Sequence, residues 1–489
     1  MLSTAEKKRV RVSNQTEAKR KAELGQFLTP VRTARFMASL FTTTSLATCY
    51  LLDPGAGIGS LSSAFLERWI KGDFIFNALE LEVFEIDRYL YDELNRSLSL
   101  YTAQSHLSYK IQGGDFIEEA VKRIQSGDCP FTHVILNPPY KKIGSTSHHR
   151  LQLRSVGIET VNLYSAFIAL SLKLMAPGGQ LVAIVPRSFC NGPYYRSFRN
   201  FILEHAVIQN IHLFESRTKI FQDNDVLQEN IIIKLERSGK QGSVIISKSN
   251  DGGFNDLLVD EYPFDRIVSP EDSQQFIYIP NSIERSTIEQ SVKVCYSLSD
   301  LGIQVSTGPV VDFRLKPYLC DLPQSNTVPL LYPAHFSQNG TEWPKNGKKP
   351  NAIQRNSNTE KWLYPNGYYC VVRRFSSKEE KRRIIATVVD PTSFGDAEML
   401  GFENHLNLFH DHKQGLNPFL AYGLTLFLNT TALDENFRQF NGHTQVNATD
   451  LKQMKYPSRT VLMELGQWAM RRGVLTQKMI DEKVGAAIA

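Results

Sequence analysis

Cysteines, long apolar runs and an excess of one charge are all scarce in this sequence. Six cysteines occur among 489 residues and none forms a Cys-x-x-Cys pair, which excludes zinc ribbons and thioredoxin-like sites and gives no support to a disulfide framework. The most apolar helical stretch, 165–176, contains Lys173 and is shorter than the roughly 20 residues that span a bilayer. The first residues, MLSTAEKKRVRV, lack the apolar segment of a secretory signal. We therefore expect a cytoplasmic protein with reduced thiols and no membrane span.

The composition is that of a folded protein. Hydrophobic residues make up 42% of the chain, which has 30 glycines and 22 prolines and a net charge of +5, so disordered and collagen-like chains are excluded. The basic charge is concentrated in residues 1–24 and 345–383, and aromatic residues are interleaved with it in the second stretch. This pattern suits binding of a polyanion with stackable bases. A solvated charged face above a few aromatic core residues would give the same sequence pattern.

Residues from about 46 to 236 predict an α/β domain with a doubly wound, mostly seven-stranded Rossmann-like sheet, because short apolar runs alternate with helical periodicity. Strands are expected at 48–52, 76–84, 108–111, 133–136, 180–185, 207–212 and 230–235, and helices at 60–70, 88–97, 117–125, 163–176 and 194–205.

After about residue 237 the regularity fades, and 301–460 is rich in Pro, Asn, Gly and aromatic residues. We expect a first domain over 1–240, whose residues 1–24 form a basic arm, a polar connection with a few strands over 241–300, and a mixed α+β second domain over 301–489 that ends in a helix.

A glycine loop follows the first expected strand. The segment Asp53-Pro-Gly-Ala-Gly-Ile-Gly places Gly55, Gly57 and Gly59 just before a helix, where glycines allow a sharp turn and close approach to a ligand. Such loops bind NAD, FAD, S-adenosylmethionine or nothing. Asp53 and this spacing favour a cofactor with a positive amino group over one with a pyrophosphate.

Acidic residues follow the second and third expected strands. Glu85 is placed to accept hydrogen bonds from ribose hydroxyls, while Asp87 could cap the next helix. After the third strand, Asp115 could accept from an adenine amino group, and Phe116 could lie on the ring.

Asn137, Pro138, Pro139 and Tyr140 follow the fourth expected strand and suit the chemistry of an exocyclic amine. In adenine the N6 lone pair is delocalised into the ring. Hydrogen bonds from the amine to the Asn137 side chain and the Pro138 carbonyl would draw the nitrogen toward tetrahedral geometry and free that lone pair for attack on a methyl sulfonium. Tyr140 would stack on a base flipped out of the duplex. We therefore predict methyl transfer to adenine, with no metal.

In this order the motifs resemble the N6-adenine DNA methyltransferases of type II restriction–modification systems, in the gamma arrangement typified by the TaqI enzyme. The segment Gly25-Gln-Phe-Leu-Thr29-Pro30 is similar to the family's N-terminal cofactor motif, which implies that Thr29 and Pro30 lie beside the methionine part of S-adenosylmethionine. Phe221 is similar to the family's phenylalanine that packs against the flipped adenine. The resemblance also implies double-stranded DNA as substrate, a separately encoded restriction endonuclease as genetic partner, and a monomer.

Two polar stretches, 401–407 and 441–447, resemble the PstI/BsuBI group, which methylates adenine in CTGCAG. Asn and Gln can hydrogen-bond to adenine and Arg or Lys to guanine, but the same residue types are also common in loops and at helix caps. The segment 141–150 is expected to be mobile until DNA binds. The candidates for DNA contact are Lys141, Lys142, Arg373, Arg374, Lys381, Arg382, Arg383, His405, Asn407, His443, Gln445 and Asn447.

Other interpretations remain. RNA-amine and protein-glutamine methylases present a similar planar amine or amide, although a glutamine methylase has no need of a large basic second domain. A non-catalytic DNA-binding relative could keep the fold, but it would not need Asp53, Asp115 and residues 137–140 together. A cytosine-C5 methylase requires a cysteine nucleophile, usually after proline, and the sequence has no Pro-Cys pair. We find no convincing metal-binding carboxylate pair and expect no DNA cleavage by this chain.

Overall fold

The computed structural model describes residues 9–11, 28–215, 229–280, 282–337, 340–377, 379–442 and 444–489. They fall into two compact units, Met1–Ile283 and Glu284–Ala489. Phe221, His443 and most of the basic arm over 1–24 lie outside the described residues. Within the described ranges, no helix is both long and apolar enough to cross a membrane.

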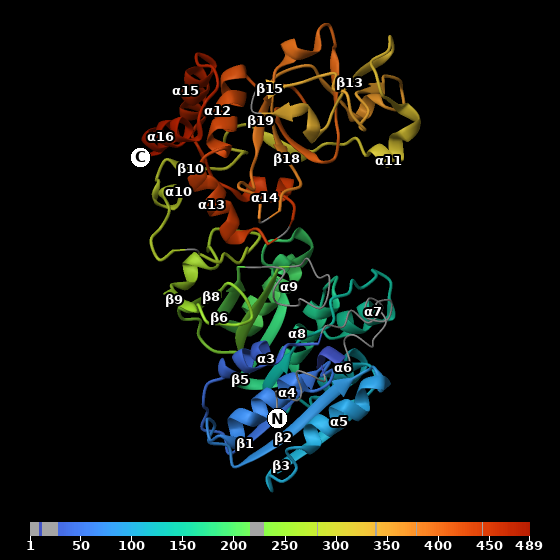
Figure 1. The fold of residues 1–489 in the computed structure, drawn as a ribbon, viewed down its shortest axis with the longest axis vertical. Helices are drawn as coiled ribbons and strands as arrows, with labels where there is room; N and C mark the ends of the chain where they lie inside the picture. The colour runs from blue at the N-terminus through green and yellow to red at the C-terminus, as the bar shows by residue number, and fades with distance from the viewer. Residues whose placement is uncertain are drawn as a thin grey trace. The chain divides into compact units, whose positions relative to one another are not determined.

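In the described part of the chain, the first unit contains a nine-stranded sheet in the order β3-β2-β1-β4-β5-β7-β6-β8-β9 (Figure 1). Strands β1 to β5 pair in parallel, and β7 runs antiparallel between β5 and β6. The strand order reverses beside β1, which is where sheets of this kind bind ligands at the carboxyl ends of their strands. The predicted doubly wound fold is confirmed. The strands are β1 (Thr48–Pro54), β2 (Ala78–Glu85), β3 (Leu107–Gly113), β4 (Phe131–Leu136), β5 (Met175–Pro186), β6 (Ala206–Phe214), β7 (Asn230–Arg237), β8 (Val244–Ser249) and β9 (Leu258–Tyr262).

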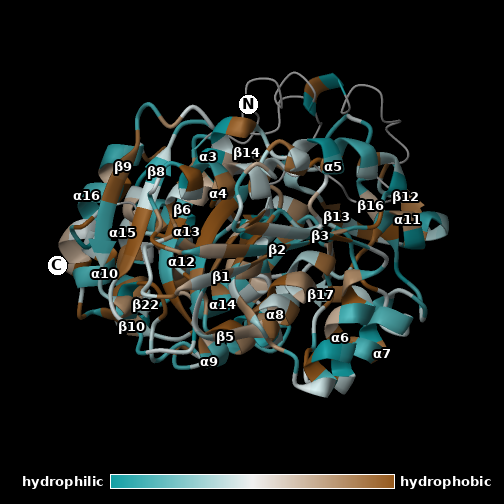
Figure 2. Cartoon of the chain, turned by 90° about the horizontal axis from the view of Figure 1, so that it is seen from below, coloured by the Kyte–Doolittle hydropathy of each residue, from teal (hydrophilic) through white to brown (hydrophobic). Residues whose placement is uncertain are grey.

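Helices cover both faces of this sheet because its central strands are apolar on both sides. Along β4, Val134 and Leu136 belong to one buried cluster with side chains of α6, α8 and α9, while Ile135 belongs to another with α3, α4 and α5. Figure 2 shows the contrast between brown interior strands and the largely teal, outlying α7. The helices are α3 (Val31–Ser39), α4 (Ser60–Ile70), α5 (Tyr91–Ser99), α6 (Phe116–Ser126), α7 (His148–Ser155), α8 (Leu163–Leu174) and α9 (Arg196–His205).

Three local predictions differ from the structure. Helix α8 stops at Leu174, because Met175 is extended and pairs with Phe131 of β4. The helix expected at 88–97 begins as a 3-10 turn, Arg88–Leu90, capped by Asp87, before α5 starts. Strands β8 and β9 lengthen the sheet beyond the seven expected strands, so the first unit extends through most of the segment 241–300 that we expected to be a connection.

The second unit combines small sheets with a helical part. Among its described residues one sheet has the order β12-β16-β13-β20-β17 and another the order β11-β21-β18-β19. The strands are β10 (Val294–Tyr296), β11 (Gln304–Thr307), β12 (Leu319–Cys320), β13 (Thr327–Leu331), β14 (Phe336–Ser337), β15 (Gly340–Thr341), β16 (Ala352–Gln354), β17 (Leu363–Pro365), β18 (Tyr369–Arg373), β19 (Ala386–Val389), β20 (Met399–Phe402), β21 (Leu406–His410) and β22 (Tyr456–Pro457). The helices are α10 (Thr287–Gln290), α11 (Asp312–Leu315), α12 (Pro418–Leu428), α13 (Thr431–Phe440), α14 (Ala448–Gln453), α15 (Arg459–Met470) and α16 (Gln477–Ile488).

Candidate active site

The glycine loop between β1 and α4 is tied to the end of β2. The backbone N–H groups of Gly55 and Ala56 both donate to the carbonyl oxygen of Phe84 at 2.8 Å, and the N–H of Gly57 donates to Oε2 of Glu85 at 2.7 Å. Gly57 has φ of +59°, and a Cβ there would lie 3.0 Å from Cδ2 of Leu28. Both its conformation and the close approach of Leu28 therefore favour glycine.

A cavity of about 200 Å³ lies beyond the carboxyl ends of β1 to β4. It brings together residues that the sequence analysis predicted from separate motifs, namely Thr29, Gly55, Gly57, Glu85, Asp115, Phe116 and Asn137. The lining residues are Leu28, Thr29, Gly55, Ala56, Gly57, Ile58, Ser60, Leu61, Phe84, Glu85, Ile86, Gly114, Asp115, Phe116, Ile117, Asn137, Pro139, Lys141, His149, Leu163 and Phe167.

Glu85 forms one acidic corner of the cavity. Its Oε2 accepts from the N–H of Gly57, and its Oε1 accepts from the N–H of Asp87 at 2.8 Å. Burial raises the pKa of Glu85, although these N–H donors act in the opposite direction. Glu85 thus places a carboxylate in the cavity lining, held by backbone N–H groups of the glycine loop and of Asp87.

Asp115 and Phe116 form a second side of the cavity. Oδ1 of Asp115 caps α6 by accepting from the N–H of Ile117 at 2.8 Å. The Phe116 ring meets Phe84 nearly edge-on, with centroids 5.2 Å apart, and is tilted against Phe167 at 4.9 Å. An apolar wall thus lies beside a carboxylate, which suits a flat heterocycle with an amino group.

Asp53 does not line the cavity, contrary to the prediction that it binds the cofactor directly. It is fully buried at the end of β1, and its Oδ2 accepts from the Ser62 hydroxyl of α4 at 2.6 Å. Burial raises the pKa of Asp53 to about 7. The carboxyl group therefore joins β1 to α4 behind the glycine loop. Pro30, the residue before α3, and Gly59, the residue before α4, also lie outside the cavity lining.

Asn137 connects the cavity to two other parts of the chain. Its Nδ2 donates to the Thr29 hydroxyl at 3.0 Å, and its Oδ1 accepts from the Tyr140 hydroxyl at 3.2 Å. The same hydroxyl lies 3.1 Å from the Ile184 carbonyl oxygen of β5. Burial raises the pKa of Tyr140 well above its ordinary value, so the phenol keeps its proton and donates. Pro139 lines the cavity, whereas Pro138 and Tyr140 lie beside it.

Several residues of this region escaped the sequence analysis. The Tyr140 ring meets Tyr164 edge-on at 6.1 Å, and Tyr164 stacks on Tyr195 at 5.7 Å. Ile86 is 56% exposed and lines the cavity. The sequence feature that could have identified Ile86 is its position between Glu85 and Asp87, just after the end of β2. No sequence signal marked the two tyrosines: Tyr164 lies in the first turn of α8, and Tyr195 ends a 3-10 turn, Pro193–Tyr195.

The segment 141–150, expected to be a mobile basic loop, is partly helical. Helix α7 begins at His148 with Ser147 as its cap, and Lys142 forms an isolated β-bridge with Asn162. Lys141 lines the cavity. Within the described residues, no group of three or more His, Cys, Asp or Glu side chains could hold a metal ion.

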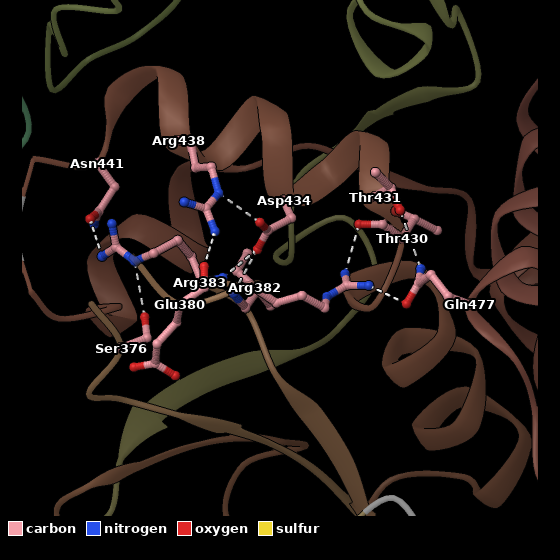
Figure 3. Close-up of polar contacts among 11 residues, drawn as sticks. Ser376, Glu380, Arg382, Arg383, Thr430, Thr431, Asp434, Arg438, Asn441 and Gln477 are labelled. Atoms are coloured by element: carbon pink, nitrogen blue, oxygen red, sulfur yellow. Dashed lines mark hydrogen bonds and ion pairs between the residues drawn. The ribbon is translucent and has the colours of Figure 1, made fainter. Parts of the chain in front are cut away.

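Two predicted DNA contacts of the second unit, Arg382 and Arg383, have hydrogen-bond partners within that unit. Arg383 is 1% exposed, and its guanidinium donates to Ser376 and to Asn441 (Figure 3). Arg382 donates to the Thr430 carbonyl oxygen and to Gln477. Oδ1 of Asp434 accepts from the backbone N–H of Arg383 at 2.7 Å. Burial thus corrects the prediction that Arg383 contacts DNA.

Three further candidates also have internal partners. Asn407 is fully buried, accepts from Thr307 and donates to the Val446 carbonyl oxygen, so it too is structural. Asn447 caps α14 together with Asp450. Arg373 pairs with Glu380.

Other candidates meet at one partly exposed place. Arg374 donates to Oε1 of Gln445 and to the Asn404 carbonyl oxygen, both at 3.2 Å. The His405 ring lies 4.8 Å from the ring of Phe375, which is 40% exposed. Three loops, distant in sequence, therefore present Arg374, Phe375, His405 and Gln445 together; we call these four residues the three-loop cluster.

Known methyltransferases resemble this chain. Residues 61–221 match the family model described as Eco57I restriction-modification methylase. The chain is 51% identical to the type II methyltransferase M.BsuBI of Bacillus subtilis over 96% of this chain and 94% of that protein. It is 40% identical to the type II methyltransferase M.PstI of Providencia stuartii over 96% and 93% of the two chains. Over 38% of its length it is 26% identical to a tRNA1(Val) (adenine(37)-N6)-methyltransferase of Shewanella woodyi, of which 76% is covered.

Proposed function

The chain belongs to the type II methyltransferases of restriction–modification systems, and we propose that it methylates N6 of one adenine in a short duplex DNA site, CTGCAG, with S-adenosylmethionine as cofactor. The observation that carries the adenine assignment is Asn137, which directly follows β4 and lines the cavity. A DNA substrate implies a cytoplasmic enzyme, and protection of that site implies a separately encoded nuclease as partner. One strand of the palindrome would be methylated at a time by a monomer.

The residues of the cavity fit S-adenosylmethionine. Glu85 can accept from the ribose hydroxyls and Asp115 from the adenine amino group, while Phe116 and Ile86 offer apolar surface to the ring. Thr29 lines the cavity beside Asn137. Bound there, the cofactor supplies an electrophilic methyl group on a sulfonium. Asp53 supports this site indirectly, through α4 and the glycine loop.

Asn137 prepares the target amine. Because Nδ2 donates to Thr29, the amide is oriented so that Oδ1 is the acceptor offered to substrate. Hydrogen bonds from adenine N6 to Oδ1 and to the Pro138 carbonyl concentrate the lone pair on the nitrogen. Tyr140 packs against the flipped base, and we assign the opposite side of that base to Phe221.

DNA recognition is assigned to the residues that remain accessible. In the three-loop cluster, Arg374 suits guanine, Gln445 suits adenine, and His405 and exposed Phe375 offer ring surface. Lys141, Lys142 and Lys381 are exposed and suit phosphates. His443 remains a further proposed contact.

RNA methylation is the leading alternative, because one relative is named for a tRNA adenine. That relative covers 38% of this chain, whereas M.BsuBI covers 96% and therefore includes the second unit. A non-catalytic relative is less consistent with the intact bonds from Asn137 to Thr29 and Tyr140. A protein-glutamine substrate leaves the second unit without a role.

The test offers labelled S-adenosylmethionine to the purified protein together with unmethylated plasmid, bulk tRNA and a protein extract in one reaction. Each fraction is then separated and counted, and the labelled nucleoside is identified. We expect label in DNA as N6-methyladenine. Label confined to RNA or protein would contradict the DNA assignment while preserving the amine chemistry, and absence of label from every fraction would favour a non-catalytic relative.

A further inference from the structure

The carboxylate of Asp115 is shared between two helices. Oδ1 accepts from the N–H of Ile117 and so caps α6, while Oδ2 accepts from Nε2–H of His149 in the first turn of α7 at 2.7 Å. Both residues line the cavity. His149 is 35% exposed and Asp115 is 23% exposed, so the pair lies at the rim of the cavity, within reach of a ligand.

His149 belongs to a segment that starts directly after the catalytic motif. Residues 141–155, which we call the covering segment, extend from the residue after Tyr140 to the end of α7. The segment is anchored by the N–H of Ile143, which donates to the Val161 carbonyl oxygen at 2.8 Å, and by Leu153, which is fully buried. One end of the covering segment therefore adjoins the residues for the target base, while His149 contacts the pocket for the cofactor.

The bond from His149 restricts the rotation of the Asp115 side chain. With both carboxylate oxygens engaged, the carboxylate plane is held in one orientation, yet a carboxylate has about four acceptor positions and can take another donor. A positioned acceptor binds its ligand better than a freely rotating one, because less conformational entropy is lost on binding.

We propose that His149 is a positioning residue for the cofactor: it holds Asp115 so that its carboxylate receives the exocyclic amine of the adenine ring. Through this bond cofactor binding also stabilises the covering segment beside Tyr140. The inference rests on the cofactor assignment above and is independent of which base in DNA is methylated.

The experiment compares calorimetric binding of S-adenosylhomocysteine with binding of its inosine analogue, which has a carbonyl in place of the amine. The variants are His149→Ala and His149→Gln, whose amide can still donate. The matched control is His148→Ala, the neighbouring residue, which is 71% exposed and 3.9 Å from Glu118. Circular dichroism checks that each variant is folded.

We expect His149→Ala to weaken binding of S-adenosylhomocysteine by up to about tenfold, because the released Asp115 side chain must then be ordered on binding, and to leave binding of the inosine analogue unchanged. His149→Gln should recover most of the loss, and His148→Ala should bind as the wild type does. Amide exchange over residues 147–155 should slow when S-adenosylhomocysteine is added to the wild type, and should not slow in His149→Ala.

Equal weakening of both ligands would overturn the proposal, since His149 would then only shape the pocket. Unchanged binding of S-adenosylhomocysteine by His149→Ala would overturn it as well. Failure of the wild type to bind S-adenosylhomocysteine would instead remove the cofactor assignment on which the proposal rests.

Discussion

The side-chain amide of Asn137 is engaged at both ends by protein groups. Thr29, 108 residues earlier in the chain, accepts from its nitrogen, and Tyr140 donates to its oxygen. In this arrangement the oxygen is the acceptor end of the amide. The motif at 137–140 predicted the role of Asn137, but only the folded chain shows why a threonine in the N-terminal motif matters for it.

Asn137→Ala should separate methyl transfer from cofactor binding. We expect kcat to fall by about 10²- to 10³-fold, the scale seen when one positioned hydrogen-bonding group is lost from an active site, because the amine loses its main acceptor. The Kd for S-adenosylhomocysteine should stay within about threefold, since Asn137 forms only part of one cavity wall. Single-turnover kinetics and calorimetry measure the two quantities. A comparable loss in both would place Asn137 in cofactor binding instead.

Asp53 should give the first unit a distinctive pH dependence. Its pKa is raised from 3.8 to about 7 by burial, so between about pH 4 and pH 7 the folded state binds more protons than the unfolded state. The contribution of Asp53 to the free energy of unfolding is therefore present below about pH 4 and is lost as the pH rises through 7.

Asp53→Asn removes that proton linkage. As the pH rises from about 4 to about 7, the free energy of unfolding of the variant should increase relative to that of the wild type, by at most about 1.4 kcal/mol per pH unit. Urea unfolding of both proteins at about pH 5 and about pH 8 provides the measurement. A difference that is the same at both pH values would show that Asp53 keeps an ordinary pKa.

Helices α12 and α15 are in backbone contact through two glycines. A Cβ at Gly466 would lie 1.7 Å from the Phe419 carbonyl oxygen, and one at Gly423 would lie 1.8 Å from that of Leu462. Both contacts are with backbone, which cannot move aside as a flexible side chain can. This close approach joins the two helices within the second unit.

Gly466→Ala should therefore destabilise the second unit by about 3 kcal/mol or more, because the helices must separate. The matched control is Gly485→Ala in α16, where an added Cβ meets no atom within 4 Å. That control should instead stabilise by up to about 1 kcal/mol through helix propensity. Denaturant unfolding followed by circular dichroism compares them, and similar effects of the two substitutions would contradict the close packing.

Elements with strong apolar periodicity were predictable from the sequence. The edge strand β3, which has no buried residue, alternates apolar and polar side chains, whereas strands β1, β2, β4, β5, β6 and β7 were located because they carry buried apolar side chains. Strand β9 was not, since it is an exposed edge strand that carries Asp260 and Glu261, and edge strands commonly carry charge. The helix α8 was expected to end at residue 176, just before the helix-breaking segment Pro177-Gly178-Gly179. It ends two residues earlier because Met175 pairs with β4, a tertiary contact.

The candidate site was predictable where topology alone positions a residue. Glu85, Asp115 and Asn137 lie at or just after the carboxyl ends of parallel strands, so their approach to one cavity follows from the fold. Burial was not predictable, and for that reason Asp53, Arg383 and Asn407 were assigned to ligands although they bond within the protein. His149 was overlooked because a polar, basic run gives no sign of which side chain turns toward the cofactor pocket.

At the scale of the whole molecule, local charge overstates the capacity to bind DNA. The stretch 345–383 holds eleven Lys and Arg against three Glu, yet Arg373, Arg382 and Arg383 are engaged by groups of their own unit. The residues left for phosphates and bases are fewer than the net charge suggests. The affinity for DNA therefore depends on which basic side chains are accessible, and not only on the net charge of the stretch.

The salt dependence of DNA binding should reflect the difference between the basic side chains that bond within the second unit and those that remain accessible. If Lys381 contacts one phosphate, Lys381→Gln should reduce the slope of log affinity against log salt by about 0.9. Arg374→Gln should weaken discrimination between the specific site and variants of its guanines by about 1–3 kcal/mol. Lys478→Gln, on exposed α16 beside Glu482, is the control and should leave the slope unchanged. An unchanged slope in Lys381→Gln would exclude that lysine from the interface.

The most direct test of the central claim maps modified bases in the DNA of cells that express the chain, with Asn137→Ala as the matched control. Single-molecule sequencing combined with nucleoside mass spectrometry identifies both the base and its position. The account predicts N6-methyladenine at one short motif, CTGCAG, in cells with the wild type and none in cells with the variant. Modified cytosine, N6-methyladenine without a defined motif, or the same pattern from Asn137→Ala would contradict it.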